Sequence, residues 1–368
     1  MEIPEIQNLD LKHKRVFLRA DLNVPLKNKK ISQDFKLQSI LPTIDYILKN
    51  GGKVILATHI GQPNAKSQTN FFDENLSTKI LVPWFKKNGY EIKYEIDLKK
   101  AELESKQNFK QILLLENLRF FNGEQEQNLE FAQLLSNLAD IYINDAFGVS
   151  HRNDASVTLL PQLFDKNHKA FGFLIEKEIK NLTKLKQNPE QPFMLVVGGN
   201  KIKDKIPLLK NFINQKLAQS ILIGGAIAQP FLKKEGITNE ILAQKNNAKI
   251  VLPTDFIKID NEDVDIGPES IKIFENEIKR AKTIFANGTM GIYEKEESEN
   301  GTKQILNAIA NSDAFTVIGG GDAVAATFMF DLSDKIDFLS TGGGAMLAFL
   351  SCEKPFIEMP GLNSITVN

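Results

Sequence analysis

Short apolar runs alternate along this chain with longer stretches in which apolar residues recur every three or four positions. The short runs have the length of buried strands, and the longer stretches have the period of amphipathic helices. This alternation is typical of βαβ units, in which helices cover both faces of a parallel sheet. The predicted strands lie within 15–20, 53–59, 111–120 and 140–148 in the first half, and within 193–199, 220–226, 282–288, 315–321 and 337–344 in the second.

One helical stretch separates the two sets of strands. It begins at about Phe173 and stops near Pro189, because residues before a proline avoid the helical conformation. The sequence therefore predicts an α/β protein with two doubly wound parallel-sheet (Rossmann-like) domains, residues 1–172 and 190–351, joined by a connector helix at 173–189. The length of 368 residues suits two domains. We expect the C-terminal tail, about 352–368, to pack back on the first domain.

The residues that follow the predicted strands differ between the two halves. Polar and charged residues follow the first set, whereas glycines follow the second, as in "VVGGNK", "LIGGAIA", "VIGGGDA" and "STGGGAM". Ligands of open α/β sheets bind at the carboxyl ends of the strands. This contrast predicts a two-substrate enzyme, with a small polar anion on one domain and a nucleotide on the other. Single residues stay ambiguous: His59 also fits an ordinary turn, and Asp145 fits a turn or hinge better than a catalyst.

The stretch "VVGGNKIKDKI", residues 196–206, places lysines at the start of a predicted helix. Positive charge is mildly unfavourable at that end of the helix dipole, unless an anion is bound there. Lys201 and Lys205 would share one face of the helix. A solvated basic turn is the alternative. Asp322, which follows three glycines, is open to two interpretations as well: an N-cap, or a ligand of magnesium beside bound phosphates.

Composition narrows the class of protein. The formal net charge of −1 argues against nucleic-acid or membrane-surface binding. Cys352 is the only cysteine, which excludes an intramolecular disulfide or a zinc knuckle, and no stretch resembles a signal peptide or a membrane span. These features favour a cytoplasmic protein. Arginine is scarce: the 45 basic residues include only Arg15, Arg19, Arg119, Arg152 and Arg280.

Nine segments, in this order, resemble the phosphoglycerate kinase family over nearly the whole chain. They are "RADLNVPL", "THIGQP", "LLLENLRF", "NDAFGVSHR", "GGNKIKDKI", "DIGPES", "ANGTMGIYE", "IGGGDA" and "STGGGA". The resemblance implies a glycolytic kinase that transfers a phosphoryl group between 1,3-bisphosphoglycerate and ADP, giving 3-phosphoglycerate and ATP. It further implies magnesium as cofactor and a monomeric enzyme.

The resemblance also implies roles for individual residues. The phosphoglycerate site would comprise Asp21, Leu22, Asn23, Lys36, His59, Ile60, Gly61, Gln62, Arg119 and Arg152. The nucleotide site would comprise Lys201, Lys205, Glu294, Gly320, Gly321, Asp322 and Ala323, with Asp322 as the magnesium ligand. The catalytic residues would be Lys36, Lys205, Arg119 and Arg152.

The sequence departs from the family pattern at several of these positions. Lys36 and Gln62 stand where the family has arginines, and lysine lacks the planar fork that grips phosphate with two hydrogen bonds. The family's "WNGP" reads "ANGT", Ala323 replaces a threonine or serine, and the stretch between "LPTDF" and "DIGP" is shorter than usual. A weakened or inactive protein that only binds phosphoglycerate and nucleotide is therefore the alternative to a kinase.

Overall fold

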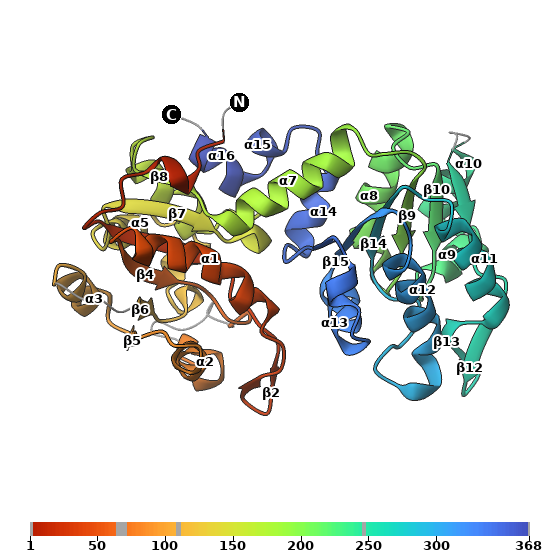
Figure 1. Ribbon diagram of the computed structural model, residues 1–368, viewed down its shortest axis with the longest axis horizontal. Helices are drawn as coiled ribbons and strands as arrows, with labels where there is room; N and C mark the ends of the chain where they lie inside the picture. The colour runs from red at the N-terminus through yellow and green to blue at the C-terminus, as the bar shows by residue number, and fades with distance from the viewer. Residues whose placement is uncertain (1–2, 64–71, 108–111, 245–247, 367–368) are drawn as a thin grey trace. The chain divides into compact units, whose positions relative to one another are not determined.

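The computed structural model describes residues 3–63, 72–107, 112–244 and 248–366. The chain divides into two compact units. Unit 1 comprises Met1–Glu178 and Lys354–Asn368, and unit 2 comprises Ile179–Glu353. Each unit is built around a six-stranded parallel sheet (Figure 1). The predicted α/β class with two doubly wound sheets is thus confirmed.

In unit 1 the strands are arranged in the order β5-β6-β4-β1-β7-β8, and all neighbours are parallel. The order reverses at β1, so the connections lead away in opposite directions and place helices on both faces of the sheet. The strands of unit 1 are β1 (Arg15–Ala20), β4 (Lys53–Ala57), β5 (Ile92–Glu95), β6 (Ile112–Leu115), β7 (Ile141–Asp145) and β8 (Lys169–Phe171), with a small hairpin of β2 (Leu26–Lys27) and β3 (Lys30–Ile31).

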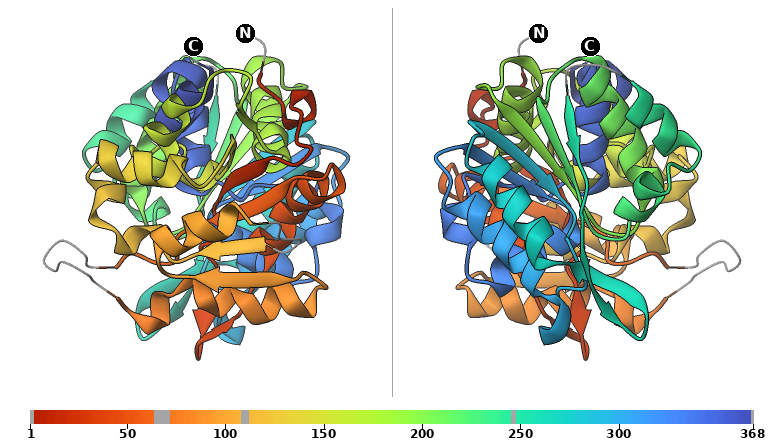
Figure 2. Two further views of the ribbon diagram at one scale, coloured as in Figure 1. Left: turned by 90° about the vertical axis from the view of Figure 1, so that its left-hand side faces the viewer. Right: turned by 90° about the vertical axis from the view of Figure 1, so that its right-hand side faces the viewer.

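In unit 2 the order is β11-β10-β9-β14-β15-β16, which is the order 3-2-1-4-5-6 of dinucleotide-binding sheets. The sheet strands are β9 (Phe193–Val197), β10 (Ser220–Ile223), β11 (Lys249–Val251), β14 (Thr283–Asn287), β15 (Phe315–Gly319) and β16 (Phe338–Leu339). A separate antiparallel hairpin of β12 (Phe256–Ile259) and β13 (Glu262–Ile266) lies apart from this sheet (Figure 2).

The α-helices connect these strands. In unit 1 they are α1 (Phe35–Lys49), α2 (Val82–Lys87), α3 (Leu98–Ser105), α4 (Asn122–Gln125), α5 (Leu129–Ser136), α6 (Ala155–Thr158), α15 (Pro355–Glu358) and α16 (Pro360–Thr366). In unit 2 they are α8 (Ile202–Asn214), α9 (Ala228–Leu232), α10 (Ile237–Ala243), α11 (Pro268–Ile278), α12 (Asn300–Ala310), α13 (Gly321–Met329) and α14 (Gly344–Ser351). Helix α7 (Phe173–Gln187) begins in unit 1 and ends in unit 2.

Helix α1 illustrates how packing positions a functional side chain. Its buried residues Leu37, Ile40 and Ile44 recur every three or four positions and join a core cluster with β1 and β4. This stripe fixes the rotation of the helix about its axis. Lys36 therefore projects from the first turn of α1 beside the carboxyl end of β1, where its ammonium meets Asp21.

The start of α7 is held by a buried carboxyl group at the end of β7. Asp145 is fully buried; it accepts a hydrogen bond from the Thr43 hydroxyl (2.5 Å) and another from the Ile175 amide (3.0 Å). Gly172 passes so close that a Cβ there would lie 2.3 Å from the Asp145 carboxyl carbon. Burial raises the pKa of Asp145 to about 7, against the opposing effect of these hydrogen bonds.

We expect Asp145→Asn to change how stability depends on pH. Between the ordinary carboxyl pKa of 3.8 and about 7, the folded protein binds a proton at Asp145 that the unfolded chain has released. This residue therefore makes the free energy of unfolding fall as pH rises through that window. One pKa unit corresponds to about 1.4 kcal/mol. Between pH 5 and 8, the free energy of unfolding of the parent should therefore fall by more than ~1.4 kcal/mol relative to that of the variant. Urea unfolding of both proteins across this range measures the difference, and parallel pH profiles would contradict the prediction.

Candidate functional site

The residues predicted to bind an anion in unit 1 gather at the carboxyl ends of four neighbouring strands. Asp21 follows β1, His59 follows β4, Arg119 follows β6, and Arg152 lies in the segment after β7. Strands β6, β4, β1 and β7 are adjacent in the sheet, so residues separated by more than 100 positions in sequence meet at one edge. Lys36 completes the group, with its Nζ 2.6 Å from Asp21 Oδ2.

Hydrogen bonds lock the loops after β1, β4 and β6 to one another. Asn23 Oδ1 accepts from the Gly61 amide (2.9 Å), and Arg119 Nη1 donates to the Gly61 carbonyl (2.7 Å). Leu22 and Ile60 are buried and take part through their backbones: the Leu22 amide donates to Thr58 Oγ1, and the Ile60 carbonyl accepts from Asn117 Nδ2. The structure thus brings the predicted residues of these loops into one network.

Several nitrogen atoms of this cluster are buried without a hydrogen-bond partner. They are Nε and Nη2 of Arg119, Nε of Arg152 and Nδ1 of His59. Buried polar groups are nearly always satisfied in folded proteins, so unpaired ones require an explanation. A bound anion would accept hydrogen bonds from the guanidinium groups. The unpaired donors therefore indicate an anion site.

Electrostatics sets the protonation of the group. Burial alone would raise the pKa of Asp21, but Lys36 and His59 hold it below the ordinary value of 3.8. Burial lowers the pKa of His59 well below 6.5, and Arg19 and Arg119 lower it further against the opposing effect of Asp21. At neutral pH the cluster therefore contains an ionised Asp21 and an uncharged His59. A bound anion would favour protonation of this histidine.

Of the residues predicted for this cluster, Gln62 makes the fewest hydrogen bonds within the described part of the chain. It is exposed and lies at the end of a described segment, two residues before the gap at 64–71. Its side chain has no hydrogen bond among the described residues. The lost arginine of the family pattern thus leaves an uncharged, unattached side chain at this position.

The structure adds three residues to this cluster that were not assigned to it from the sequence: Arg19, His151 and Asp154. Arg19 is completely buried and donates from Nε to Ser156 Oγ (2.7 Å), and its Nη2 lies 3.5 Å from Glu124 Oε1. His151 has a buried Nδ1 without a partner. Asp154 is buried, and its Oδ2 lies 3.8 Å from Arg119 Nη2.

The candidate nucleotide site of unit 2 is a cavity of about 680 Å³ at the carboxyl ends of its strands. Gly199, Gly225, Gly291, Glu294 and Asp322 are among its lining residues. Cavities of 300–1,000 Å³ are typical of small-molecule and cofactor sites. Three of the predicted glycine-rich turns, at Gly199, Gly225 and Gly291, thus line an actual cavity. Two of the predicted nucleotide-site residues, Glu294 and Asp322, line it as well, whereas the other five are not among its lining residues: Lys201, Lys205, Gly320, Gly321 and Ala323.

The two lysines of the opening motif lie at the start of α8. Lys201 occupies the N-cap position and is exposed. Lys205 is half-buried, and its Nζ donates to Asn287 Oδ1 at the end of β14. Burial and the neighbouring Lys201 lower the pKa of Lys205 below 10.5, while Asp204 and Asp322 oppose this shift. The ammonium of Lys205 is therefore held in place near the carboxylate of Asp322.

The turn after β15 exposes the N-terminus of α13. Gly320 adopts φ 96° and is the N-cap, while Gly321 and Asp322 are exposed at the first turn. Asn287 explains why residue 320 is a glycine: its Nδ2 would lie 2.8 Å from a Cβ, and it donates to the Gly319 carbonyl (2.7 Å). Ala323 is buried, so it can contribute only backbone to a ligand. These exposed amides suit a phosphate group.

Asp322 is the carboxylate of this cavity that lies at the N-terminus of a helix. In the described residues, no three His, Cys, Asp or Glu side chains converge as a preformed metal site. Asp322 is nevertheless exposed, lines the cavity and lies at the helix N-terminus. Magnesium usually binds through one or two carboxylates together with substrate phosphates, so a single aspartate beside a phosphate site fits this ion.

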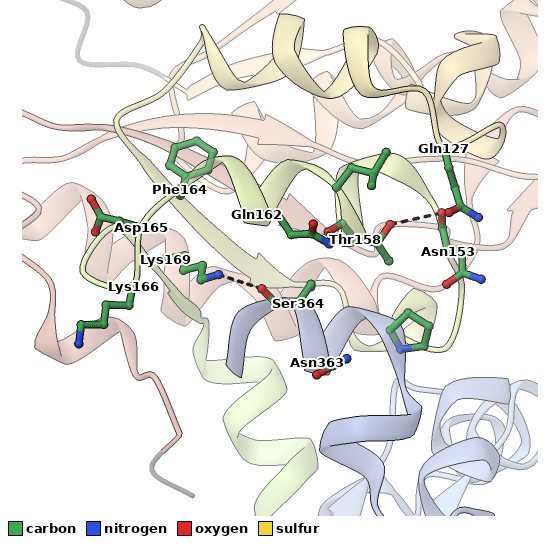
Figure 3. A pocket seen from close by; sticks show the side chains of 12 residues that line it. Gln127, Asn153, Thr158, Gln162, Phe164, Asp165, Lys166, Lys169, Asn363 and Ser364 are labelled. Atoms are coloured by element: carbon green, nitrogen blue, oxygen red, sulfur yellow. Dashed lines mark hydrogen bonds between the residues drawn. The ribbon is translucent and has the colours of Figure 1, made fainter. Parts of the chain in front are cut away.

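Figure 3 shows another cavity, of about 760 Å³, in unit 1. It lies between the region of α6 and helix α16, and Lys169 Nζ donates to the Ser364 carbonyl (3.0 Å) at its wall. None of the predicted site residues lines it, although Asn153 is the neighbour of Arg152. Size alone therefore does not identify the functional site. None of the described helices is long and apolar enough to span a bilayer.

Comparisons with known proteins agree on one family. The family model described as "Phosphoglycerate kinase" matches residues 6–353. The phosphoglycerate kinase of Thermosipho africanus is 39% identical, over 99% of this chain and 98% of that protein, and that of Bdellovibrio bacteriovorus is 37% identical, over 98% and 96%. The phosphoglycerate kinase structure from Coxiella burnetii has a TM-score of 0.82 at 30% identity, covering 99% of both chains. The one from Pyrococcus horikoshii has a TM-score of 0.84 at 28% identity, covering 99% and 98%.

Proposed function

Because this chain belongs to the phosphoglycerate kinase family, we propose that its two units divide the reaction of that family between them. The enzyme is a phosphotransferase that moves a phosphoryl group between 1,3-bisphosphoglycerate and ADP, giving 3-phosphoglycerate and ATP. Unit 1 would bind the phosphoglycerate at its cluster of cations. Unit 2 would bind the nucleotide in its glycine-lined cavity.

The observation that carries the assignment of unit 1 is the set of unpaired guanidinium nitrogens of Arg119 and Arg152. 3-Phosphoglycerate has a carboxylate and a phosphate, which are the groups that guanidinium binds with paired hydrogen bonds. Asn23 and the Gly61 loop would position the glycerate, because they are tied to Arg119 in one network. His59 would donate to the anion.

Lys201, Lys205 and the first turn of α13 carry the assignment of unit 2. The backbone amides at Gly320 and Gly321 would hold phosphate oxygens, with Ala323 contributing backbone only. Glu294 is exposed on the turn after β14 and lines the same cavity, where it would accept from the ribose hydroxyls. In this proposal the phosphates would lie at the N-termini of α8 and α13, and the nucleoside would lie in the cavity beside Glu294.

The chemistry requires charge and position rather than proton transfer. The carboxylate of 3-phosphoglycerate is ionised at neutral pH, so its attack on the terminal phosphoryl group of ATP needs no general base. Catalysis then depends on neutralising the negative charge of the transferring group. Lys205 would supply one positive charge from unit 2, while Lys36, Arg119 and Arg152 would supply others from unit 1. Asn287 holds Lys205, and Asp21 holds Lys36.

We further propose Asp322 as the protein ligand of magnesium. When bound, the ion would neutralise phosphate oxygens of the nucleotide. The substrates belong to the glycolytic pool, which favours a cytoplasmic protein, and every proposed site residue comes from this one chain, which favours a functional monomer. Nucleic acids and membranes have no part in this proposal.

Restoring the arginines of the family pattern tests whether their loss weakens the enzyme. Lys36→Arg should raise kcat by about 10-fold, equivalent to about 1.4 kcal/mol, because a guanidinium can keep one hydrogen bond to Asp21 and offer further donors to a phosphoryl group. Gln62→Arg should chiefly lower the KM for 3-phosphoglycerate, because it adds a positive charge at the anion site. Steady-state kinetics with ATP, magnesium and 3-phosphoglycerate measures both constants.

Lys49→Arg is the matched control, since Lys49 is exposed at the far end of the same helix α1. It should leave kcat and KM unchanged. If both restored arginines leave these constants within about twofold of the parent, neighbouring lysines have compensated for the loss. If the parent is inactive and the double variant Lys36→Arg, Gln62→Arg turns over, the natural protein is the binding protein of the alternative.

A further inference from the structure

Asp154 is a buried carboxylate in the cation cluster of unit 1 that no proposed step of the reaction uses. It precedes α6, but its side chain makes no capping hydrogen bond to that helix. Only 6% of the residue is exposed, and its Oδ2 has no hydrogen-bond partner. The nearest cationic group is Arg119, with 3.8 Å between Nη2 and Oδ2, which is too long for a hydrogen bond.

The other carboxylates of the cluster have close partners. Asp21 receives the ammonium of Lys36 at 2.6 Å. Glu124 accepts two hydrogen bonds from Ser156, at 2.6 and 2.9 Å, and lies beside Arg19. Asp154 has neither arrangement. Its charge is therefore the least compensated of the three.

The charge of Asp154 acts on the same groups that a bound anion would contact. Burial lowers the pKa of Arg119, and Asp154 is the largest opposing influence. Burial and Arg152 lower the pKa of His151, and Asp154 again opposes the shift. An anionic ligand bound to Arg119 and Arg152 would thus compete with the carboxylate of Asp154 for the positive charge of Arg119. This carboxylate lies 3.8 Å from Arg119 and is buried from water.

We propose that Asp154 sets the affinity of the anion site: it weakens the binding of phosphoglycerate at Arg119 and thereby favours its release. This inference rests on the proposed role of unit 1 as the phosphoglycerate site. The 3.8 Å distance between Arg119 Nη2 and Asp154 Oδ2 supports this inference. At that distance the Nε and Nη2 donors of Arg119 make no hydrogen bond to Asp154 and stay available to a ligand. Asp154 acts through Arg119 and is a positioning residue rather than a catalytic one.

The test is calorimetric titration of 3-phosphoglycerate into the full chain without nucleotide. Asp154→Asn keeps the shape and removes the charge, so it should bind about 10-fold more tightly, equivalent to about 1.4 kcal/mol. Asp154→Glu, which retains the charge, should stay close to the parent. Asp165→Asn is the control for net charge: Asp165 lies in unit 1 at the other cavity, paired with His168, and its loss should not alter binding.

Steady-state kinetics gives a second measurement, because replacing a residue that only stabilises the fold would not lower the KM for 3-phosphoglycerate. Asp154→Asn should lower the KM for 3-phosphoglycerate by a similar factor without raising kcat. Asp154→Ser provides a second uncharged variant in case the asparagine destabilises the fold. Unchanged or weaker binding by folded Asp154→Asn and Asp154→Ser, beside a parent that binds, would overturn the inference alone. A parent that does not bind 3-phosphoglycerate would overturn the proposed function and this inference with it.

Discussion

Lys205→Ala should reduce kcat by roughly 10²–10³ and raise the KM for ATP by only a few-fold. The ammonium of Lys205 is half-buried and fixed by the Asn287 side chain, so it is already oriented before any substrate binds. A preoriented charge is worth most where negative charge develops, which is on the transferring phosphoryl group. Its removal should therefore affect the chemical step more than nucleotide binding.

Lys203→Ala is the matched control, because Lys203 is exposed and lies on a different face of α8 from Lys201 and Lys205. It removes the same charge from the same helix and should leave kcat within about twofold. Lys201→Ala should fall between the two and act partly on the KM for ATP. An effect of Lys205→Ala confined to the KM would remove Lys205 from the catalytic residues.

Asp322→Ala should lower turnover by roughly 10² or more and weaken ATP binding only when magnesium is present. The N-cap interpretation of Asp322 is wrong, because Gly320 occupies that position and the Asp322 side chain makes no capping hydrogen bond. Asp322→Asn keeps the size of the side chain but brings no charge to a metal. It should therefore be nearly as impaired as Asp322→Ala if the residue binds magnesium, and nearly normal if the charge has no role.

Titration of ATP into each variant, with magnesium and with a chelator, separates these cases independently of activity. The parent should bind ATP more tightly with magnesium, and both variants should lose that difference. Thermal unfolding in the absence of nucleotide should be similar for all three proteins, since Asp322 is exposed. Full magnesium-dependent activity of Asp322→Ala would leave the residue no role in metal binding.

The central strands of both sheets could be predicted from the sequence, and most of the edge strands could not. Strands such as β7 and β9 are buried at every position and read as continuous apolar runs. The edge strands β5, β8 and β11 are three or four residues long, and β11 has a single buried residue, so no periodic signal marks them. The hairpin of β12 and β13 was missed as well, because its residues are mostly exposed or half-buried.

Part of the candidate site could be predicted because strand ends define where ligands bind. Asp21, His59, Arg119 and Arg152 each follow a recognisable strand, so their meeting at one edge of the sheet follows from the topology. Arg19 was missed because it lies within a strand, where a charged residue is expected to face solvent, whereas the structure buries it against Ser156 and Glu124.

Asp154 could not have been found from sequence. It belongs to no motif, and its importance depends on the 3.8 Å approach to Arg119, a residue 35 positions away in the sequence. The lack of a closer partner is likewise visible only in three dimensions. Spacing in sequence identifies which residues reach a site, whereas the balance of charge within the site requires the packed structure.

The most direct test of the proposed function is an assay of the unmodified chain with ATP, magnesium and 3-phosphoglycerate. The rate of turnover is measured by coupling formation of the acyl phosphate product to its reduction. We expect product formation at about 1 s⁻¹ or faster, proportional to protein concentration and dependent on all three components. A folded protein that binds nucleotide and 3-phosphoglycerate tightly, but forms no product, would contradict it and identify the chain as a binding protein with a kinase fold.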